Sequence, residues 1–353
     1  MLTHPPKPNR PAERKDGKKA ISIAMQGGGA HGAFTWGVLD RLLEDGRFII
    51  EGITGASAGA MNAAGTIQGL LEGGNEGARR VLRSYWTALI ESGKTSALKP
   101  GPVDQMLNKF TMQNTPAFIM FDLMLKFLSP YQYNPMGLDP LKDLIMKVFD
   151  FEKIRKNKEY KLFMSATHVY TGKIKVFKTE EFCPEALLAT ACLPTIHAAV
   201  MVNGEYYWDG GFIGNPVIYP LVYECETPDI LVIKLNPTHR NRLPTTSGEI
   251  SDRLNEITNN TSILREMRSI HFITKLIDEG LIDPTRIKKL HMHLIQDEAA
   301  FQDLGWSSKL NTDKKFVDYL FAAGYKAADK WISENFKKIG VESTMPMDDL
   351  FMS

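Results

Sequence analysis

The chain has few cysteines, no excess of one charge and no long apolar run, and each absence excludes a class of protein. Its 353 residues include three cysteines, Cys183, Cys192 and Cys225, whose number and spacing fit neither a disulfide framework nor a metal site. Lys and Arg total 42 against 41 Asp and Glu, so the basic excess of a dedicated nucleic-acid binder is missing. No apolar run approaches the roughly 20 residues of a membrane-spanning helix. We therefore expect a cytoplasmic globular protein with reduced thiols that binds no nucleic acid.

The N-terminal segment differs in composition from the rest of the chain. Residues 1–19 carry four prolines and six Lys or Arg against two Asp or Glu, a local charge of +4 that leaves −3 for the other 334 residues. The segment contains no apolar stretch, so it does not fit a cleaved secretory signal. We expect a disordered, solvated tail; an arm that docks on anionic lipid is the alternative.

Strand and helix patterns alternate from residue 20 onward. Residues 20–25 and 48–54 predict buried strands, and residues 36–43 and 60–71 predict the helices that follow them. Further strands are expected at residues 160–166, 173–177, 200–202, 229–235 and 289–294, and helices at residues 250–280 and 312–339. This alternation predicts an α/β fold with a mostly parallel central sheet and helices on both faces.

The first glycine-rich motif, residues 27–32 (GGGAHG), lies between the first strand and its helix. It matches the dinucleotide fingerprint G-x-G-x-x-G, and Glu51 follows Gly32 by 19 residues, where a ribose-binding acid is expected. The same loop could instead form an oxyanion hole. Glycines let backbone N–H groups point at one spot, and the helix N-terminus adds positive potential. Taken alone, this motif leaves both interpretations open.

The second motif, residues 55–59 (GASAG), matches G-x-S-x-G and lies between the second strand and its helix. In such a nucleophile elbow Ser57 occupies a sharp, strained turn that exposes its hydroxyl, and small neighbours make room for the turn. A dinucleotide-binding fold gives no reason for a nucleophile at this position. The two motifs together therefore favour an enzyme with a serine nucleophile beside an oxyanion hole.

A serine hydroxyl needs a general base, and two residues are candidates. Asp209 is followed by Gly210 and Gly211, which allow a tight turn toward Ser57. His239 follows the strand predicted at residues 229–235, and the order Ser57, Asp209, His239 would suit an α/β-hydrolase triad. Against the triad, Ser57 lies on only the second strand and His239 lies in a polar loop. We prefer a Ser57–Asp209 dyad and keep the triad as the alternative.

These motifs resemble those of the patatin-like phospholipase family, particularly its bacterial members. The resemblance rests on residues 27–32, 55–59 and 209–211, together with the block 189–194. It covers about residues 20–225 by motif, and the blocks at residues 252–257 and 307–311 resemble long bacterial members and extend it to about residue 340. The family often has arginine where His31 stands, and we interpret His31 as a structural or cleft-lining residue. The residues that support the motif turns are Gly32, Gly55, Gly59, Gly210, Gly211 and Pro194.

The resemblance implies a three-layer α/β/α patatin-like fold and hydrolysis of lipid acyl esters of the phospholipase A or lysophospholipase type. Ser57 and Asp209 would act through an acyl-enzyme without a metal or other cofactor. The oxyanion hole would be drawn from the backbone N–H groups of Gly27, Gly28, Gly29 and Ala58. A short-chain or polyester esterase and an acyltransferase share these motifs, and a dinucleotide-binding protein is the alternative from another class. The expected partner is a lipid substrate, with peripheral membrane contact as an option.

The domain organisation follows from the separation of the motifs. Ser57 and Asp209 lie 152 residues apart and must meet in one cleft, so we expect a catalytic domain at residues 20–225. Residues 226–353 would add the final core strands and a mainly helical extension. Residues 106–136 form an apolar insertion, in which residues 118–128 hold nine apolar side chains in eleven positions. We keep three interpretations: a buried helix, a lid or acyl pocket with Met120, Phe121 and Met124, and an interfacial anchor.

Overall fold

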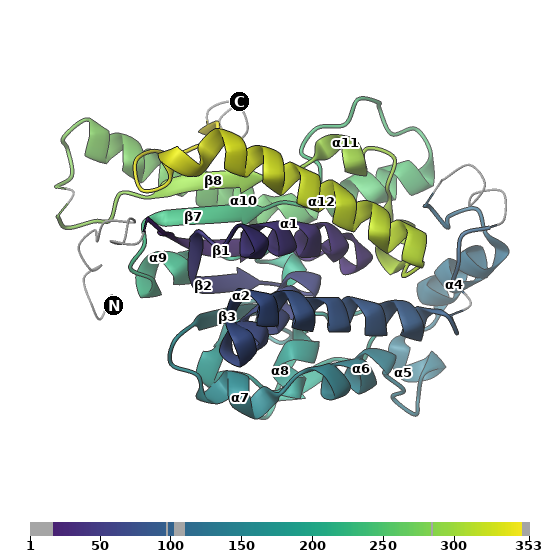
Figure 1. Ribbon diagram of the computed structural model, residues 1–353. Helices are drawn as coiled ribbons and strands as arrows, with labels where there is room; N and C mark the ends of the chain where they lie inside the picture. The colour runs from purple at the N-terminus through teal and green to yellow at the C-terminus, as the bar shows by residue number, and fades with distance from the viewer. Residues whose placement is uncertain (1–16, 97, 102–109, 284, 348–353) are drawn as a thin grey trace.

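The structure is a computed structural model that describes residues 17–96, 98–101, 110–283 and 285–347. Its centre is an eight-stranded sheet in the order β5-β6-β3-β2-β1-β7-β8, with β4 paired to β3 (Figure 1). The strands are β1 (Lys19–Met25), β2 (Phe48–Gly55), β3 (Lys161–His168), β4 (Ile174–Lys178), β5 (Val200–Val202), β6 (Glu205–Asp209), β7 (Asp229–Ile233) and β8 (His291–Ile295). The pairings β3–β2, β2–β1, β1–β7 and β7–β8 are parallel, whereas β4, β5 and β6 join antiparallel. The mostly parallel sheet predicted from the sequence is confirmed.

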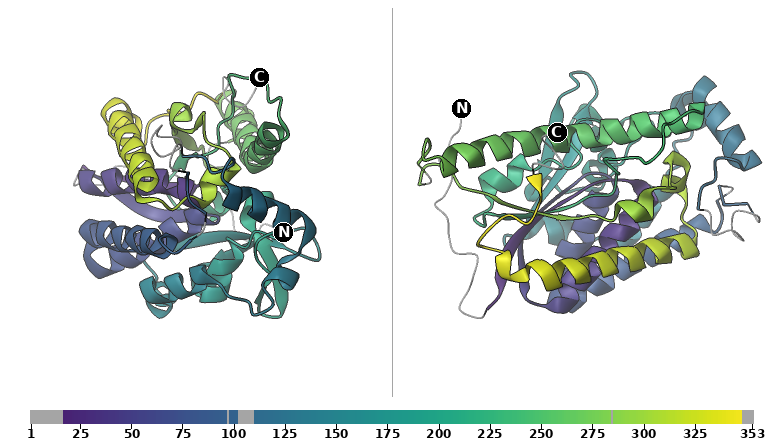
Figure 2. Two further views of the ribbon diagram at one scale, coloured as in Figure 1. Left: turned by 90° about the vertical axis from the view of Figure 1, so that its right-hand side faces the viewer. Right: turned by 90° about the horizontal axis from the view of Figure 1, so that it is seen from above.

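Helices cover both faces of this sheet. The longer ones are α1 (Gly32–Asp45), α2 (Ala58–Gly93), α4 (Pro116–Phe127), α6 (Pro140–Val148), α10 (Ser247–Asp278) and α12 (Lys314–Asn335). The shorter ones are α5 (Pro130–Tyr133), α7 (Phe151–Lys156), α8 (Pro184–Ala189), α9 (Tyr219–Glu224), α11 (Glu298–Phe301), η1 (Gly29–His31), η2 (Thr179–Glu181), η3 (Gly210–Phe212), η4 (Trp306–Leu310) and η5 (Phe336–Lys338). Helices α1, α2 and α12 lie on one face and α10 on the other (Figure 2). This is the three-layer arrangement that a buried parallel sheet requires.

Strand β1 shows how the two faces are buried. Ile21 and Ile23 are fully buried in the cluster formed with α1 and α12. Ala24 points to the opposite cluster, which contains Ile263 and Met267 of α10. Because both faces of β1 are covered, its residues 20–25 form an apolar run interrupted only by Ser22.

The residues after position 225 complete the sheet. Strand β7 pairs with β1, and β8 pairs with β7 at the sheet edge. Helix α12 packs closely on α1: a Cβ atom on Gly37 would lie 2.0 Å from the Phe321 carbonyl oxygen, and one on Gly324 would lie 2.0 Å from that of Phe34. The C-terminal part of the chain therefore shares one core with the motif-bearing part.

Two expectations about the ends and insertion need correction. Strand β1 begins at Lys19, whose ammonium donates to the Ile339 carbonyl at 2.7 Å, so the expected tail at residues 1–19 reaches too far. Residues 1–16 of that tail lie outside the described residues.

In α4 only Phe118 is buried, while Met120 is 74% and Phe127 80% exposed, so the interpretation of α4 as a buried helix is wrong. Within the described part of the chain, no helix has the length and apolar character to cross a membrane.

Candidate active site

Ser57 occupies a strained turn between β2 and α2. Its φ of 52° and ψ of −126° lie in a region that residues other than glycine rarely adopt. The turn is fixed on both sides, because the Ser57 N–H donates to the Thr190 carbonyl at 3.0 Å and the Ser57 carbonyl accepts from the Met61 N–H at 3.1 Å. This is the geometry of a nucleophile elbow, with the serine at the carboxyl end of a central strand and at the N-terminus of a long helix.

The glycines around this turn allow close backbone packing. A Cβ atom on Gly55 would lie 2.5 Å from the carbonyl carbon of Gly59, and one on Gly27 would lie 2.8 Å from the Ser57 Cβ. The first glycine motif and the elbow are therefore in direct contact. The other motif glycines lie where their turns are made: Gly32 at the start of α1, Gly210 and Gly211 in η3; Pro194 follows the pocket residue Leu193.

Asp209 is the last residue of β6, and its side chain is almost completely buried. Its N–H donates to the Cys192 carbonyl at 2.8 Å, and its Oδ1 accepts from the Gly211 N–H at 2.6 Å. Burial raises the pKa of Asp209 to about 7, although the Gly211 N–H, the Ser57 hydroxyl and the charge of Lys309 each act to lower it. A carboxyl group with a pKa near neutrality, in contact with a serine hydroxyl, is suited to accept the proton of that serine.

Gly27, Gly28 and Gly29 line the pocket of Ser57 and Asp209, and Ala58 directly follows Ser57 in the chain. Gly29 begins η1 and Ala58 begins α2, so neither N–H has an intrahelical partner. The Gly28 N–H donates to no described residue. The Gly27 N–H, in contrast, donates to the Asn215 side chain at 2.6 Å. The expectation that Gly27 contributes a donor to an oxyanion hole is therefore corrected, since its N–H is already engaged.

Ser57 and Asp209 line one pocket with an empty volume of about 670 Å³. Its other lining residues are Gly27, Gly28, Gly29, Leu193, Gly211, Phe212, Asn215, Asn255, Thr258, Asn259, Trp306, Lys309 and Leu310. One wall is polar and comes mainly from α10, whereas Leu193, Phe212, Trp306 and Leu310 contribute apolar surface. The pocket thus offers separate surroundings for a polar and an apolar part of one ligand.

Other candidate residues lie elsewhere. His239 is exposed and does not line the pocket of Ser57. Met120, Phe121 and Met124 do not line it either, so their assignment to an acyl pocket stays a prediction. The Glu51 carboxylate accepts the N–H groups of residues 226 and 227 and pairs with a lysine, so it is not presented to a ribose. The geometry therefore favours neither the triad nor a dinucleotide site.

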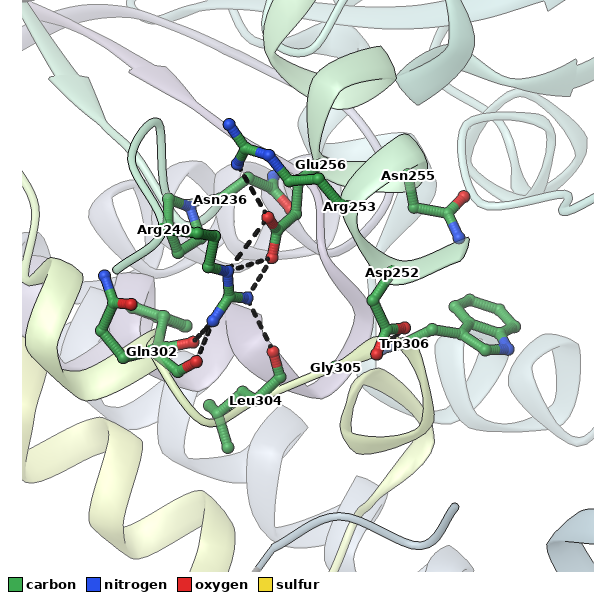
Figure 3. A network of polar contacts seen from close by, with 12 residues as sticks. Asn236, Arg240, Asp252, Arg253, Asn255, Glu256, Gln302, Leu304, Gly305 and Trp306 are labelled. Carbon is green, nitrogen blue, oxygen red and sulfur yellow. Dashed lines mark hydrogen bonds and ion pairs between the residues drawn. The ribbon is translucent and has the colours of Figure 1, made fainter. Parts of the chain in front are cut away.

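The C-terminal wall of the pocket was not predicted, because the resemblance at residues 252–257 and 307–311 assigns these blocks no role in the site. Figure 3 shows how this wall is held: the Arg240 guanidinium binds Glu256 of α10 and the carbonyls of Gln302 and Leu304, just before η4. Asp252 of α10 accepts the Trp306 N–H at 2.7 Å. These contacts fix η4 against α10, so that both elements border the pocket.

His31 connects the first glycine motif to η4. Its Nε2 lies 2.7 Å from the Ser308 hydroxyl oxygen, and that hydroxyl donates to the Gly305 carbonyl at 2.7 Å. Since the hydroxyl has a single proton, His31 must be the donor. Burial holds the pKa of His31 well below its usual range, so the ring is neutral. The expected structural role of this histidine agrees with these contacts.

The patatin-like phospholipase family model matches residues 23–222. The chain belongs to this family. A patatin-like phospholipase is a hydrolase of lipid acyl esters, so this protein is an enzyme with a lipid substrate. No curated protein matches the chain. Among solved structures, it is similar to VipD from Legionella pneumophila, with 13% identity and a TM-score of 0.42 over 99% of this chain and 77% of that one.

Proposed function

We propose that this patatin-like phospholipase is a phospholipase A or lysophospholipase that uses Ser57 as nucleophile and Asp209 as general base. The observation that carries the proposal is the shared pocket. The pocket is lined by a serine in a strained elbow, a buried carboxyl group whose pKa is about 7, and the loop residues Gly28 and Gly29. His239 is exposed and takes no part.

In the proposed first step the Ser57 hydroxyl attacks the ester carbonyl and its proton passes to the Asp209 carboxylate. The negative charge that forms on the carbonyl oxygen is stabilised by N–H groups of Gly28, Gly29 and Ala58, each worth about 3–4 kcal/mol in comparable sites. The tetrahedral intermediate collapses, the carbon–oxygen bond of the ester breaks, and the leaving alcohol takes the proton from Asp209.

The second step releases the fatty acid. Asp209, again a carboxylate, accepts a proton from water while the water oxygen attacks the acyl-enzyme carbonyl. The same N–H groups stabilise the second tetrahedral intermediate, and its collapse returns the proton to Ser57. An ester bond is broken and a water molecule consumed in each cycle.

The proposal includes contact with a lipid surface through α4. Four apolar residues of α4 and its C-cap residue are exposed to solvent: Ile119, Met120, Leu123, Phe127 and Leu128. Helix α4 lies at the same end of the molecule as the first turns of α10, where Ile250, Leu254 and Ile257 are also exposed (Figure 2). Because Asn255 and Thr258 of α10 line the pocket, this apolar surface borders the entrance for substrate.

Labelling with a fluorophosphonate tests the proposal. The wild-type protein should be labelled, Ser57→Ala should abolish labelling, and Asp209→Ala should slow it by at least about a hundredfold, as removal of a general base does. Ser269→Ala, at an exposed serine of α10, is the matched control. A folded wild-type protein that reacts with no probe contradicts the proposal. Loss of labelling in folded His239→Ala would replace the dyad by the triad.

A further inference from the structure

Lys309 belongs to η4, a segment outside the residues that match the family model. It lies directly against the first glycine motif, since a Cβ atom on Gly29 would be 2.3 Å from the Lys309 carbonyl oxygen. The residue lines the pocket that contains Ser57 and Asp209. It also lines a second, smaller pocket that includes Asn236, so Lys309 lies between this pocket and the one that contains Ser57.

The Lys309 ammonium is held in place by a chain of amide groups. Its Nζ donates to Asn236 Oδ1 at 3.0 Å, and Asn236 Nδ2 donates to Gln26 Oε1 at 3.1 Å. Gln26 is fully buried and directly precedes the glycine motif. The position of the ammonium is thereby tied to the same loop that carries the N–H groups of Gly28 and Gly29.

The charge of Lys309 is left without an ion-pair partner among the described residues. Glu256 is the acid whose charge acts most strongly on Lys309, but its carboxylate is already bound by Arg240 and Arg253 (Figure 3). Asp252 accepts hydrogen bonds from Gln113 and Trp306 instead. An ammonium carries three donors, of which only the one to Asn236 is used within the described part of the chain. Burial lowers the pKa of Lys309 although the charges of Glu256, Asp252 and Asp209 act to raise it, and a bound anion would raise it further.

The surroundings of Lys309 fit a phosphate ester. Asn255 and Asn259 line the same pocket, and each carries amide N–H groups, one of which Asn259 uses on the Asn255 carbonyl at 2.7 Å. Thr258 also lines the pocket, but its hydroxyl proton goes to the Leu254 carbonyl at 2.9 Å. A lysine ammonium with neutral donors beside it is a recurring arrangement for phosphate, which lysine binds as a point charge. Phe212 and Leu193 line the same pocket with apolar side chains, which suit the hydrocarbon part of the same lipid.

We propose that Lys309 forms a phosphate subsite that holds the head group of a phospholipid while Ser57 attacks its ester. This inference rests on the proposed function and narrows it, because it selects phosphate-bearing lipids over neutral glycerides. It also gives the C-terminal segment a direct role in substrate recognition, although that segment lies outside the residues that match the family model.

Two substrates with the same acyl ester separate this role from catalysis. We would measure kcat/KM for 1-palmitoylglycerophosphocholine and for 1-palmitoylglycerol in the same nonionic detergent micelles, with wild type, Lys309→Met, Lys309→Arg and the control Lys275→Met. Lys275 is exposed near the C-terminal end of α10. An effect on Asp209 alters both substrates equally and cancels in the ratio of the two values.

The expected result is a fall in that ratio of roughly 10- to 100-fold in Lys309→Met, the value of one hydrogen bond to a charged group. Lys309→Arg should keep most of the ratio and Lys275→Met all of it. An unchanged ratio in folded Lys309→Met overturns the proposal, as does an equally low ratio in Lys309→Arg. A folded wild-type protein that cleaves neither ester contradicts the proposed function itself, which is a distinct result.

A second measurement needs no variant and applies if Lys309→Met does not fold. Non-hydrolysable 1-O-hexadecylglycerophosphocholine and 1-O-hexadecylglycerol are compared as protectants of wild-type Ser57 against a fluorophosphonate. We expect half-protection at a concentration at least tenfold lower for the phosphate-bearing ether. Equal protection by the two ethers overturns the phosphate subsite while leaving labelling of Ser57 intact.

Discussion

Asn215 binds both main-chain polar groups of Gly27. The Gly27 N–H donates to Asn215 Oδ1 at 2.6 Å, and Asn215 Nδ2 donates to the Gly27 carbonyl at 3.3 Å. This amide therefore holds the first residue of the glycine motif by a paired contact like that between two peptide groups. The next two residues, Gly28 and Gly29, carry N–H groups proposed to stabilise the oxyanion, so their placement depends on Asn215.

Asn215→Ala should lower kcat by roughly 10- to 100-fold with a smaller change in KM, because misplaced oxyanion donors act mainly on the transition state. The free energy of unfolding should fall by about 1–3 kcal/mol, since the Gly27 N–H is left buried without a partner. Stopped-flow or steady-state assays with a soluble ester, together with urea unfolding, measure both quantities. Asn241→Ala, in an exposed loop, is the control. An unchanged kcat would show that the loop holds its shape without Asn215.

The pKa of Asp209 predicts the pH dependence of the reaction. Burial raises this pKa to about 7, and the general base must be a carboxylate. The value of kcat/KM for an uncharged ester should therefore fall about tenfold per pH unit below that point and level off above it. Lys309 lowers the pKa of Asp209, so Lys309→Met should move the midpoint to higher pH. The control Lys275→Met should leave the midpoint unchanged. An unchanged midpoint in Lys309→Met would show that the charge of Lys309 does not affect the pKa of Asp209.

Local patterns in the sequence predicted seven of the eight strands and the position of the elbow. Strand β6 (Glu205–Asp209), which ends at Asp209, was not predicted. A buried parallel strand such as β1 is an apolar run, and the turn at Ser57 needs small neighbours that stand out in the sequence. The strands expected at residues 160–166 and 229–235 correspond to β3 and β7 within one or two residues at each end.

The pocket wall could not be predicted, because it is built from long-range contacts. Lys309 meets the glycine loop through a carbonyl contact with Gly29, and nothing in the residues around position 309 indicates that partner. The engagement of Gly27 by Asn215 joins residues 188 positions apart. The interpretation of α4 as a buried helix was wrong because composition alone does not fix burial. Its residues are mostly apolar, as in a buried helix, but no other element of the described chain covers most of its surface.

Gly29→Ala tests the close approach of η4 to the glycine loop. Gly29 has a φ of 58°, and an added Cβ would meet the Lys309 carbonyl oxygen at 2.3 Å. Both the backbone conformation and the contact oppose a side chain, so we expect a loss of at least about 1–3 kcal/mol in the free energy of unfolding and a fall in kcat. Gly248→Ala, where nothing lies within 4 Å of the added Cβ, is the control and should be neutral or slightly stabilising. Thermal melts and esterase assays compare the two; equal melting temperatures would contradict the contact.

Charging the exposed face of α4 tests its contact with a lipid surface. Met120 is 74% and Phe127 80% exposed, so Met120→Asp and Phe127→Asp should leave the melting temperature nearly unchanged. Each should weaken binding to phospholipid vesicles by roughly tenfold, because insertion of an apolar side chain is replaced by desolvation of a charge. Activity on vesicles should fall in parallel, while activity on a short soluble ester should stay within about twofold, as for a surface change away from the catalytic pocket. Leu281→Asp is the matched control, as Leu281 is 68% exposed beyond the C-terminal end of α10. If the α4 variants lose activity on both substrates to the same degree, α4 acts on the active site itself; if neither substrate is affected, the lipid surface is met elsewhere.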